Sequence, residues 1–152
     1  MTDYSALIPE LKDWSDGRGI DAESWIGCVG SFQHAIGYST LFWPTFVEFE
    51  GYVLREGFTV DDLRACERAG GSDRRAIESV INHIHIADTH YSGCPDISRE
   101  RVVFLGRILR ETYTAKLAWQ FPERSFTVHF DDSEFDNLTD YQLTFFQNDR
   151  NA

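Results

Sequence analysis

The longest uncharged stretch of the chain runs from Ser24 to Val47, and its pattern predicts a buried helix. At 100° per residue, bulky apolar side chains fall on one face and small ones on nearly the opposite face. The apolar face consists of Trp25, Val29, Phe32 and Ile36, and the opposite face of Gly27, Gly30, His34 and Gly37. Because such a helix is enclosed on both sides, we expect the rest of the protein to pack around it.

Apolar residues at helical spacing, together with capping residues, predict four further helices. They cover residues 5–14, 60–69, 72–91 and 99–119, with caps at Thr59, at Ser72 or Asp73, and at Ser98. The central helix is expected to begin after a cap at Asp21 and to end near Tyr38, because Pro44 cannot continue it. Its glycine face is expected to pack closely against the helix over residues 72–91.

Strict alternation of apolar and polar residues predicts a C-terminal β-hairpin with strands at residues 125–130 and 140–146. Residues 46–54 alternate less regularly and predict a third strand, in which Gly51 marks a bulge. The predicted class is therefore α+β, with about five helices packed on a small antiparallel sheet of roughly three strands. The length of 152 residues suits a single globular domain, residues 1–152, with its own core.

The net charge of −11 is unevenly distributed and narrows the possible functions. Residues 1–62 carry eleven acids and three bases, residues 63–130 eight acids and ten bases, and residues 131–152 six acids and one base. A general nucleic-acid binder needs Lys and Arg to neutralise phosphates, so this balance argues against direct nucleic-acid binding. It permits a protein that attracts a basic partner, and the alternative, which the charge alone favours, is that the acidity serves solubility.

The sequence also predicts a cytoplasmic location. The uncharged stretch would place Gln33, His34 and three glycines near the middle of a bilayer, which argues against a membrane span. The acidic N-terminus does not have the pattern of a signal peptide. The three cysteines are far apart and form no CxxC pair, which is typical of free thiols in a reducing compartment.

The residues most suggestive of chemistry lie in the run from Asn82 to His90, which contains three of the five histidines. On the predicted helix, His85 and Asp88 are one turn apart, and with His34 they could form a metal or acid–base site. The structural alternative is that Asp88, which continues an apolar stripe, is buried and paired with an Arg of the helix over residues 99–119. Because no GxSxG, HExxH or phosphate-loop spacing occurs, we expect neither a cofactor nor a resident metal.

The sequence therefore favours a non-enzymatic protein-binding or inhibitor domain that acts through acidic surfaces on a basic protein. In size, charge and class it resembles small acidic immunity proteins, which neutralise a toxin that is often a nuclease. The expected contact residues are the acids Glu48, Glu50, Asp131, Asp132, Glu134 and Asp136. The aromatic residues Phe42, Trp43, Phe46 and Phe135 could form a further partner surface or could equally belong to the core, and the aromatic content is compatible with a homodimer. The alternative is a small metal-dependent or acid–base hydrolase that uses His85 and Asp88 with His34.

Overall fold

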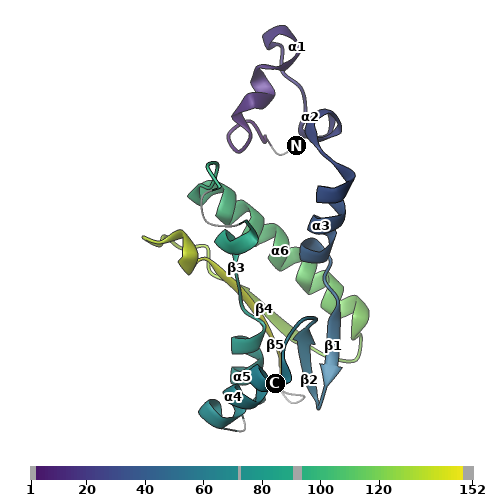
Figure 1. Ribbon diagram of the computed structural model, residues 1–152, viewed down its shortest axis with the longest axis vertical. Helices are drawn as coiled ribbons and strands as arrows, with labels where there is room; N and C mark the ends of the chain where they lie inside the picture. The colour runs from purple at the N-terminus through teal and green to yellow at the C-terminus, as the bar shows by residue number, and fades with distance from the viewer. Residues whose placement is uncertain (1–2, 72, 91–93, 149–152) are drawn as a thin grey trace. The chain divides into compact units, whose positions relative to one another are not determined.

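The structure is a computed structural model that describes residues 3–71, 73–90 and 94–148. The chain divides into two units, residues 1–39 and residues 40–152, and each is described by itself. The described residues form six α-helices and two antiparallel sheets, one of two strands and one of three (Figure 1). The α+β class predicted from the sequence is confirmed. Within the described part of the chain, no helix combines the length and the apolar character that a membrane crossing requires.

The first unit contains short helices where the sequence predicted long ones. Its elements are a 3-10 helix (Pro9–Lys12), α1 (Trp14–Gly17), α2 (Ala22–Val29) and the first part of α3 (Phe32–Phe42). The helix predicted over residues 5–14 is therefore wrong in type and extent. Asp21 caps α2 as predicted, because its Oδ1 accepts a hydrogen bond from the Ser24 N–H at 2.7 Å.

The uncharged stretch forms two helices rather than one, and the break falls at Gly30. Gly30 leaves the helical conformation with a ψ of 165°, and Ser31 Oγ accepts from the His34 N–H to start α3. A side chain at position 30 would place its Cβ 2.5 Å from the carbonyl oxygen of Ile26. Helices α2 and α3 bury none of their side chains, and Phe32 is 90% exposed. The prediction of one continuous helix was wrong, because apolar spacing identifies a face and does not show where the backbone leaves the helical conformation. That the rest of the protein packs around this stretch stays a prediction, since it concerns contacts between the two units.

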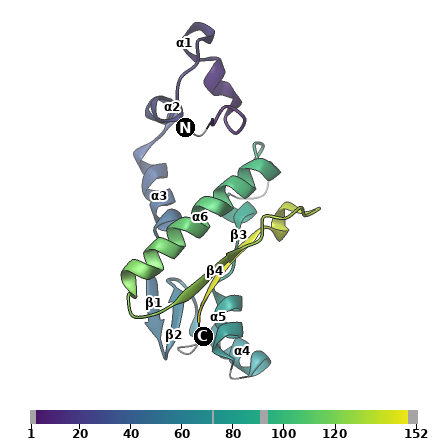
Figure 2. The ribbon, with the colours of Figure 1, turned by 180° about the vertical axis from the view of Figure 1, so that it is seen from behind.

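The core of the second unit lies between α6 (Arg99–Gln120) and the three-stranded sheet, whose strand order is β3-β5-β4. The strands are β3 (Ile84–His85), β4 (Phe126–Phe130) and β5 (Gln142–Gln147). Helix α6 runs along β4 and covers one face of the sheet (Figure 2). Its cap at Ser98 and the β4–β5 hairpin confirm the predictions for this half of the chain.

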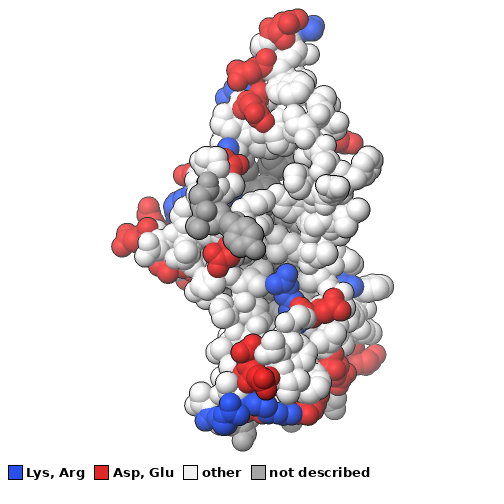
Figure 3. Space-filling model, viewed as in Figure 1, with Lys and Arg blue, Asp and Glu red and all other residues white. Residues whose placement is uncertain are grey.

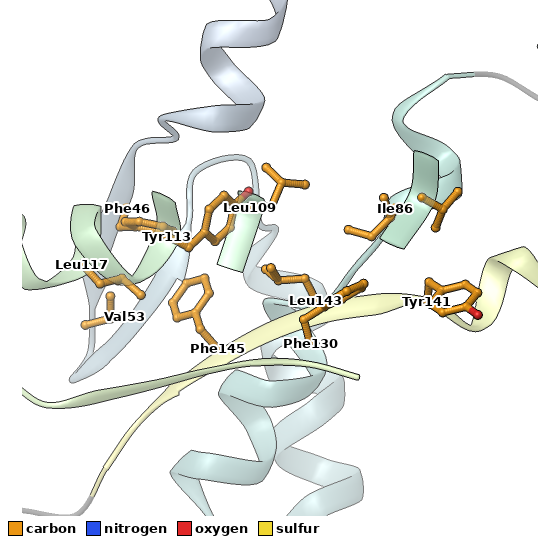
Figure 4. Packing of buried hydrophobic residues seen from close by; sticks show 11 residues of the cluster. Phe46, Val53, Ile86, Leu109, Tyr113, Leu117, Phe130, Tyr141, Leu143 and Phe145 are labelled. Atoms are coloured by element: carbon orange, nitrogen blue, oxygen red, sulfur yellow. The ribbon is translucent and has the colours of Figure 1, made fainter. Parts of the chain in front are cut away.

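Aromatic rings at the centre of this core come from three elements that lie far apart in the sequence. The ring of Phe46 contacts Phe145 with centroids 4.8 Å apart and Tyr113 with centroids 5.5 Å apart, both edge to face (Figure 4). Such pairs contribute about 0.5–1.5 kcal/mol beyond the burial of their area. Leu109 and Leu117 of α6 fill the space beside these rings and are almost fully buried. Helix α6, rather than the uncharged stretch, is therefore the helix that organises this unit.

Residues 46–54 form a hairpin and not the single strand that the sequence predicted. Strand β1 (Phe46–Phe49) pairs with β2 (Tyr52–Arg55), and Phe49 lies opposite Tyr52. The two residues between the strands, Glu50 and Gly51, have φ values of 50° and 86°. Two positive φ values are what a tight two-residue hairpin turn requires, so Gly51 marks a turn rather than a bulge.

Helices α4 (Val60–Gly70) and α5 (Arg74–Ile81) follow this hairpin, capped by Thr59 and by Asp73. The helix predicted over residues 72–91 is wrong beyond Ile81, because the chain continues as β3 and a 3-10 helix, η2 (Ile86–Thr89). Its predicted ends, Ser72 and Tyr91, lie outside the described residues. The predicted packing of the glycine face against this helix stays a prediction, because Gly27 and Gly37 belong to the first unit and α5 to the second.

Glu78 of α5 is fully buried, and the groups that bind it come from both sheets. Its Oε1 accepts from the Val53 N–H of β2 at 2.8 Å, and its Oε2 accepts from the Gln147 N–H of β5 at 2.7 Å. The side-chain amide of Gln147 donates a third hydrogen bond to Oε1 at 2.5 Å. A buried carboxylate with three donors is compensated by hydrogen bonds rather than by a cation.

Asn82, one turn after Glu78, also links β2 to β5, through its side-chain amide. Its Nδ2 donates to the carbonyl oxygens of Val53, at 3.0 Å, and of Phe145, at 3.2 Å. Its Oδ1 accepts from the Arg55 N–H at 3.0 Å. At the C-terminal end of α5, Asn82 thus satisfies backbone groups of β2 and β5 that would otherwise be unpaired.

The backbone groups bound by Glu78 and Asn82 are those that a neighbouring strand would bind. The Asn148 N–H donates to the carbonyl oxygen of Ser125, so these two residues form a hydrogen-bonded pair between β4 and β5. In an antiparallel ladder, hydrogen-bonded pairs alternate with pairs that are not bonded to each other. The N–H and C=O groups of Phe145 and Gln147 therefore point away from β4. Side chains of α5 thus take the place of a strand between β2 and β5. For this reason the β1–β2 hairpin forms a sheet of its own instead of joining the C-terminal hairpin.

Candidate functional site

The loop between β4 and β5 carries five acids within residues 131–140 and is anchored to the core. The ring of Phe135 packs edge to face on Tyr141, with centroids 5.0 Å apart, and the Phe135 N–H donates to the Tyr141 hydroxyl at 3.3 Å. Leu138 begins a 3-10 helix, η3 (Leu138–Asp140), and packs against the core. The backbone of this loop is therefore held in place from within.

Most carboxylates of this loop point to solvent. Asp131, Glu134, Asp136 and Asp140 are exposed, and Figure 3 shows acidic side chains gathered at this end of the hairpin. Asp132 differs, because it forms an ion pair of 2.8 Å with Arg107 of α6. The Ser133 N–H donates to Asp131 Oδ1 at 2.9 Å, and this bond, with the Ser133 side chain, lowers the pKa of Asp131.

The other two predicted contact acids lie on the β1–β2 hairpin and are neutralised by the protein's own arginines. Glu48 Oε1 lies 2.5 Å from Arg124, and Glu50 binds Arg64 through both carboxylate oxygens at 2.6 and 2.7 Å. Arg64 also binds Glu67, and this contact lowers the pKa of Glu67. The structure thus divides the six predicted contact acids into those of the β4–β5 loop and two that are paired elsewhere.

The proposed trio of His85, Asp88 and His34 is spread over three elements. His85 is in β3, Asp88 in η2, and His34 on α3 in the first unit. Among the residues that the structure describes, no group of three or more His, Cys, Asp or Glu side chains is arranged to hold a metal ion. The trio remains a prediction.

The prediction that Asp88 is buried and paired with an arginine of α6 was wrong. Asp88 is exposed, and no ion pair of Asp88 occurs within the described ranges. Arg99, at the start of α6, donates instead to the hydroxyl of Tyr141 at 2.8 Å, and Arg101 pairs with Asp96. The apolar stripe that suggested burial assumed a continuous α-helix, whereas beyond Ile81 the chain forms β3 and the 3-10 helix η2.

Cys94 is not set up as a nucleophile. Its thiol donates to Asp96 Oδ1 at 2.8 Å, and this bond raises the pKa of Cys94. A raised pKa reduces the thiolate fraction on which cysteine reactivity depends.

Two exposed tryptophans, Trp43 and Trp119, lie close together, and only Trp43 was predicted from the sequence as a candidate surface residue. Trp43 is 49% exposed and Trp119 70% exposed, and their ring centroids lie 6.4 Å apart. The ammonium of Lys116 lies over both rings, 5.2 and 4.4 Å from their centroids. The spacing of Lys116 and Trp119, three residues apart on α6, was the signal that could have identified this surface. Of the other predicted surface aromatics, Phe46 is buried and Phe135 packs on Tyr141.

Comparisons with known proteins place no further constraint on this site. A scan against protein-family models, a search of curated proteins and a search of solved structures each found no match to the chain.

Proposed function

We propose that this chain is a protein-binding domain whose β4–β5 loop contacts a basic protein. The observation that carries the proposal is the exposure of Glu134, Asp136 and Asp140 on a loop that the core holds in place. Within residues 3–71, 73–90 and 94–148, no Lys or Arg forms an ion pair with these three side chains. The pKa of Arg99 is raised by its hydrogen bond to Tyr141 and by the charge of Glu134, but all three carboxylates are exposed and can be reached by a partner.

Two physical effects support this use of the loop. Closely spaced like charges create a local field that raises the association rate of an oppositely charged protein. The anchoring of Phe135 and Leu138 reduces the conformational entropy that the loop would lose on binding. The paired acids Glu48 and Glu50 contribute less, because a partner would first have to displace Arg124 and Arg64.

The partner class that fits this surface is a basic protein with clustered Lys or Arg. Inhibition follows if that cluster is the partner's own anion-binding or nucleic-acid-binding surface, as in the immunity-type function that the sequence suggests. The proposal assigns binding to the loop and requires no catalytic group in this chain.

The test compares two variants with the same change of net charge. The loop variant is Glu134→Lys with Asp136→Lys, which avoids the turn made by Asp131 and the ion pair of Asp132. The control variant is Glu56→Lys with Glu123→Lys, two exposed acids of the same unit outside the loop. Immobilised wild-type protein is used to capture binding proteins from an extract of the source cells, and each captured protein is purified and titrated against all three forms.

We expect at least one basic protein to bind the wild type and the control with similar affinity and the loop variant at least about tenfold more weakly. Thermal unfolding of the three forms should be similar, since the substituted side chains are exposed. The proposal is wrong if every captured protein binds the loop variant and the control equally well.

A further inference from the structure

His83 and His85 lie side by side because the chain is extended where the sequence predicted a helix. His83 follows the end of α5, and His85 lies in β3, so the two side chains, with one residue between them, lie on the same face of the extended segment. Their ring centroids are 5.2 Å apart, and the ring planes meet at 83°. On the predicted helix these two histidines would have pointed to different sides.

In each of the two rings, the Nδ1 atom forms a hydrogen bond with a backbone carbonyl oxygen. His83 Nδ1 lies 2.5 Å from the carbonyl oxygen of Val80 in the last turn of α5. His85 Nδ1 lies 2.6 Å from the carbonyl oxygen of Thr139 in the β4–β5 loop. A carbonyl oxygen can only accept a hydrogen bond, so Nδ1 carries the proton in both rings. In the neutral imidazole, the lone pair is then on Nε2.

This arrangement is the one that prepares histidines to bind a metal. Metal-ligating imidazoles commonly donate their other ring N–H to a backbone carbonyl or a carboxylate, which fixes the tautomer and orients the ring. Two imidazoles bound to one ion at about 2.0–2.1 Å, with an angle of about 90–110° at the metal, have ring centroids roughly 4.5–5.2 Å apart. The observed separation of 5.2 Å falls at the upper end of that range.

We propose that His83 and His85 bind one divalent transition-metal ion through their Nε2 atoms. Imidazole nitrogen favours Cu²⁺, Ni²⁺ and Zn²⁺ over the hard cations Mg²⁺ and Ca²⁺. No third His, Cys, Asp or Glu of the described chain joins them, so the remaining coordination positions are filled by water. His83 is exposed and His85 half-buried, which leaves the ion a path from solvent. The site is independent of the proposed protein-binding function.

The test uses the purified, tag-free protein and the metal ions alone. Cu²⁺ and Zn²⁺ are titrated into the wild type, His83→Ala, His85→Ala and the double variant. The matched control is His129→Ala, an exposed histidine of β4. Electron paramagnetic resonance of the Cu²⁺-loaded protein counts the nitrogen ligands, and long-range ¹H–¹⁵N spectra of the metal-free protein report the tautomer of each ring.

We expect one equivalent of Cu²⁺ with two nitrogen ligands, and Kd at least about tenfold weaker in each single variant. The double variant should lose little more than either single variant, because both rings serve one ion. The control should bind as the wild type does. An equal Kd in His83→Ala, a single nitrogen ligand, or the Nε2–H tautomer in either ring would overturn the proposal.

If a variant fails to fold, a Zn²⁺ titration of the wild-type protein followed by NMR still tests the proposal. Zn²⁺ should shift the ¹⁵N resonance of Nε2 in both His83 and His85 at the same metal concentration. Shifts confined to one ring, or spread equally over His129, would show that no shared site exists.

Discussion

The acids near the two ends of β5 are held in opposite ways. At the end of the strand that contains Gln147, Glu78 is fully buried and accepts three hydrogen bonds from β2 and β5. At the end that begins with Gln142, the carboxylates of Glu134, Asp136 and Asp140 are exposed. The role of each acid is therefore set by the hydrogen-bond donors around it. Glu78 binds backbone groups that a neighbouring strand would otherwise bind, whereas the loop acids are exposed to other molecules.

The largest effect should follow removal of the Glu78 carboxylate. Glu78→Ala leaves the Val53 N–H and the Gln147 N–H without an acceptor in the protein interior, and the Gln147 side-chain amide keeps only the carbonyl oxygen of Gly51. We expect a loss of about 3–5 kcal/mol in the free energy of unfolding, measured by urea denaturation. A loss below about 1 kcal/mol would contradict the assignment of Glu78 as the link between the sheets.

The isosteric variant Glu78→Gln sharpens this result. The amide keeps one acceptor oxygen but presents an NH₂ group to a backbone N–H that needs an acceptor. We expect Glu78→Gln to be destabilised as well, by about 2–3 kcal/mol, since two donors would face each other. Stability equal to that of the wild type would show that shape, and not the carboxylate, matters at this position.

A smaller loss is expected for Asn82→Ala. This change removes the acceptor of the Arg55 N–H and the donor to the carbonyl oxygens of Val53 and Phe145. We expect about 2–3 kcal/mol, because the groups left without a partner are buried but neutral, so no buried charge is involved. Hydrogen exchange should report faster exchange at Arg55 in this variant, and unchanged exchange there would count against the bond.

The ion pair between Glu48 and Arg124 should contribute little to stability. The two side chains are 50% and 23% exposed, so solvent screens the pair. A double-mutant cycle with Glu48→Ala and Arg124→Ala should give a coupling of about 1 kcal/mol or less. A coupling several times larger would mean that this acid is structural, as Glu78 is.

The smallest effect concerns the titration of Asp131 in the loop. Because the Ser133 N–H and side chain lower its pKa, Asp131 contributes stability that is present above the ordinary Asp pKa and is lost as the pH falls through the lowered value. A carboxyl NMR titration should give a midpoint below that of an ordinary Asp. Ser133→Ala should reduce this shift without abolishing it, because the backbone donor remains. A midpoint at or above the ordinary value would be inconsistent with the turn.

Local patterns predicted the second half of the fold well. The sequence predicted helix α6 with its Ser98 cap, and the strands β4 and β5. Each of these elements shows a regular hydrophobic period and a residue that marks its boundary. The helix caps at Asp21 and Thr59 could be predicted for the same reason. These features depend on residues within one turn or one strand of each other.

The failures all depend on contacts that are distant in the sequence. The helix predicted over residues 72–91 ends at Ile81, and the chain then pairs with β5, which cannot be recognised from residues 72–91 alone. The break at Gly30 was compatible with the apolar spacing, which continues across it. For the candidate site, the sequence identified the loop acids but could not separate them from Glu48 and Glu50, whose arginines come from distant elements. The adjacency of His83 and His85 was hidden by the helix prediction.

The most direct test of the central claim is the association rate of the captured basic partner with the three charge forms, measured over a series of salt concentrations. Free loop acids should act by steering, so Glu134→Lys with Asp136→Lys should lower the association rate constant about tenfold or more at low salt. The difference from the wild type should shrink as salt increases, and the control Glu56→Lys with Glu123→Lys should behave nearly as the wild type does. An association rate that is the same in the loop variant and the control at every salt concentration would contradict the account.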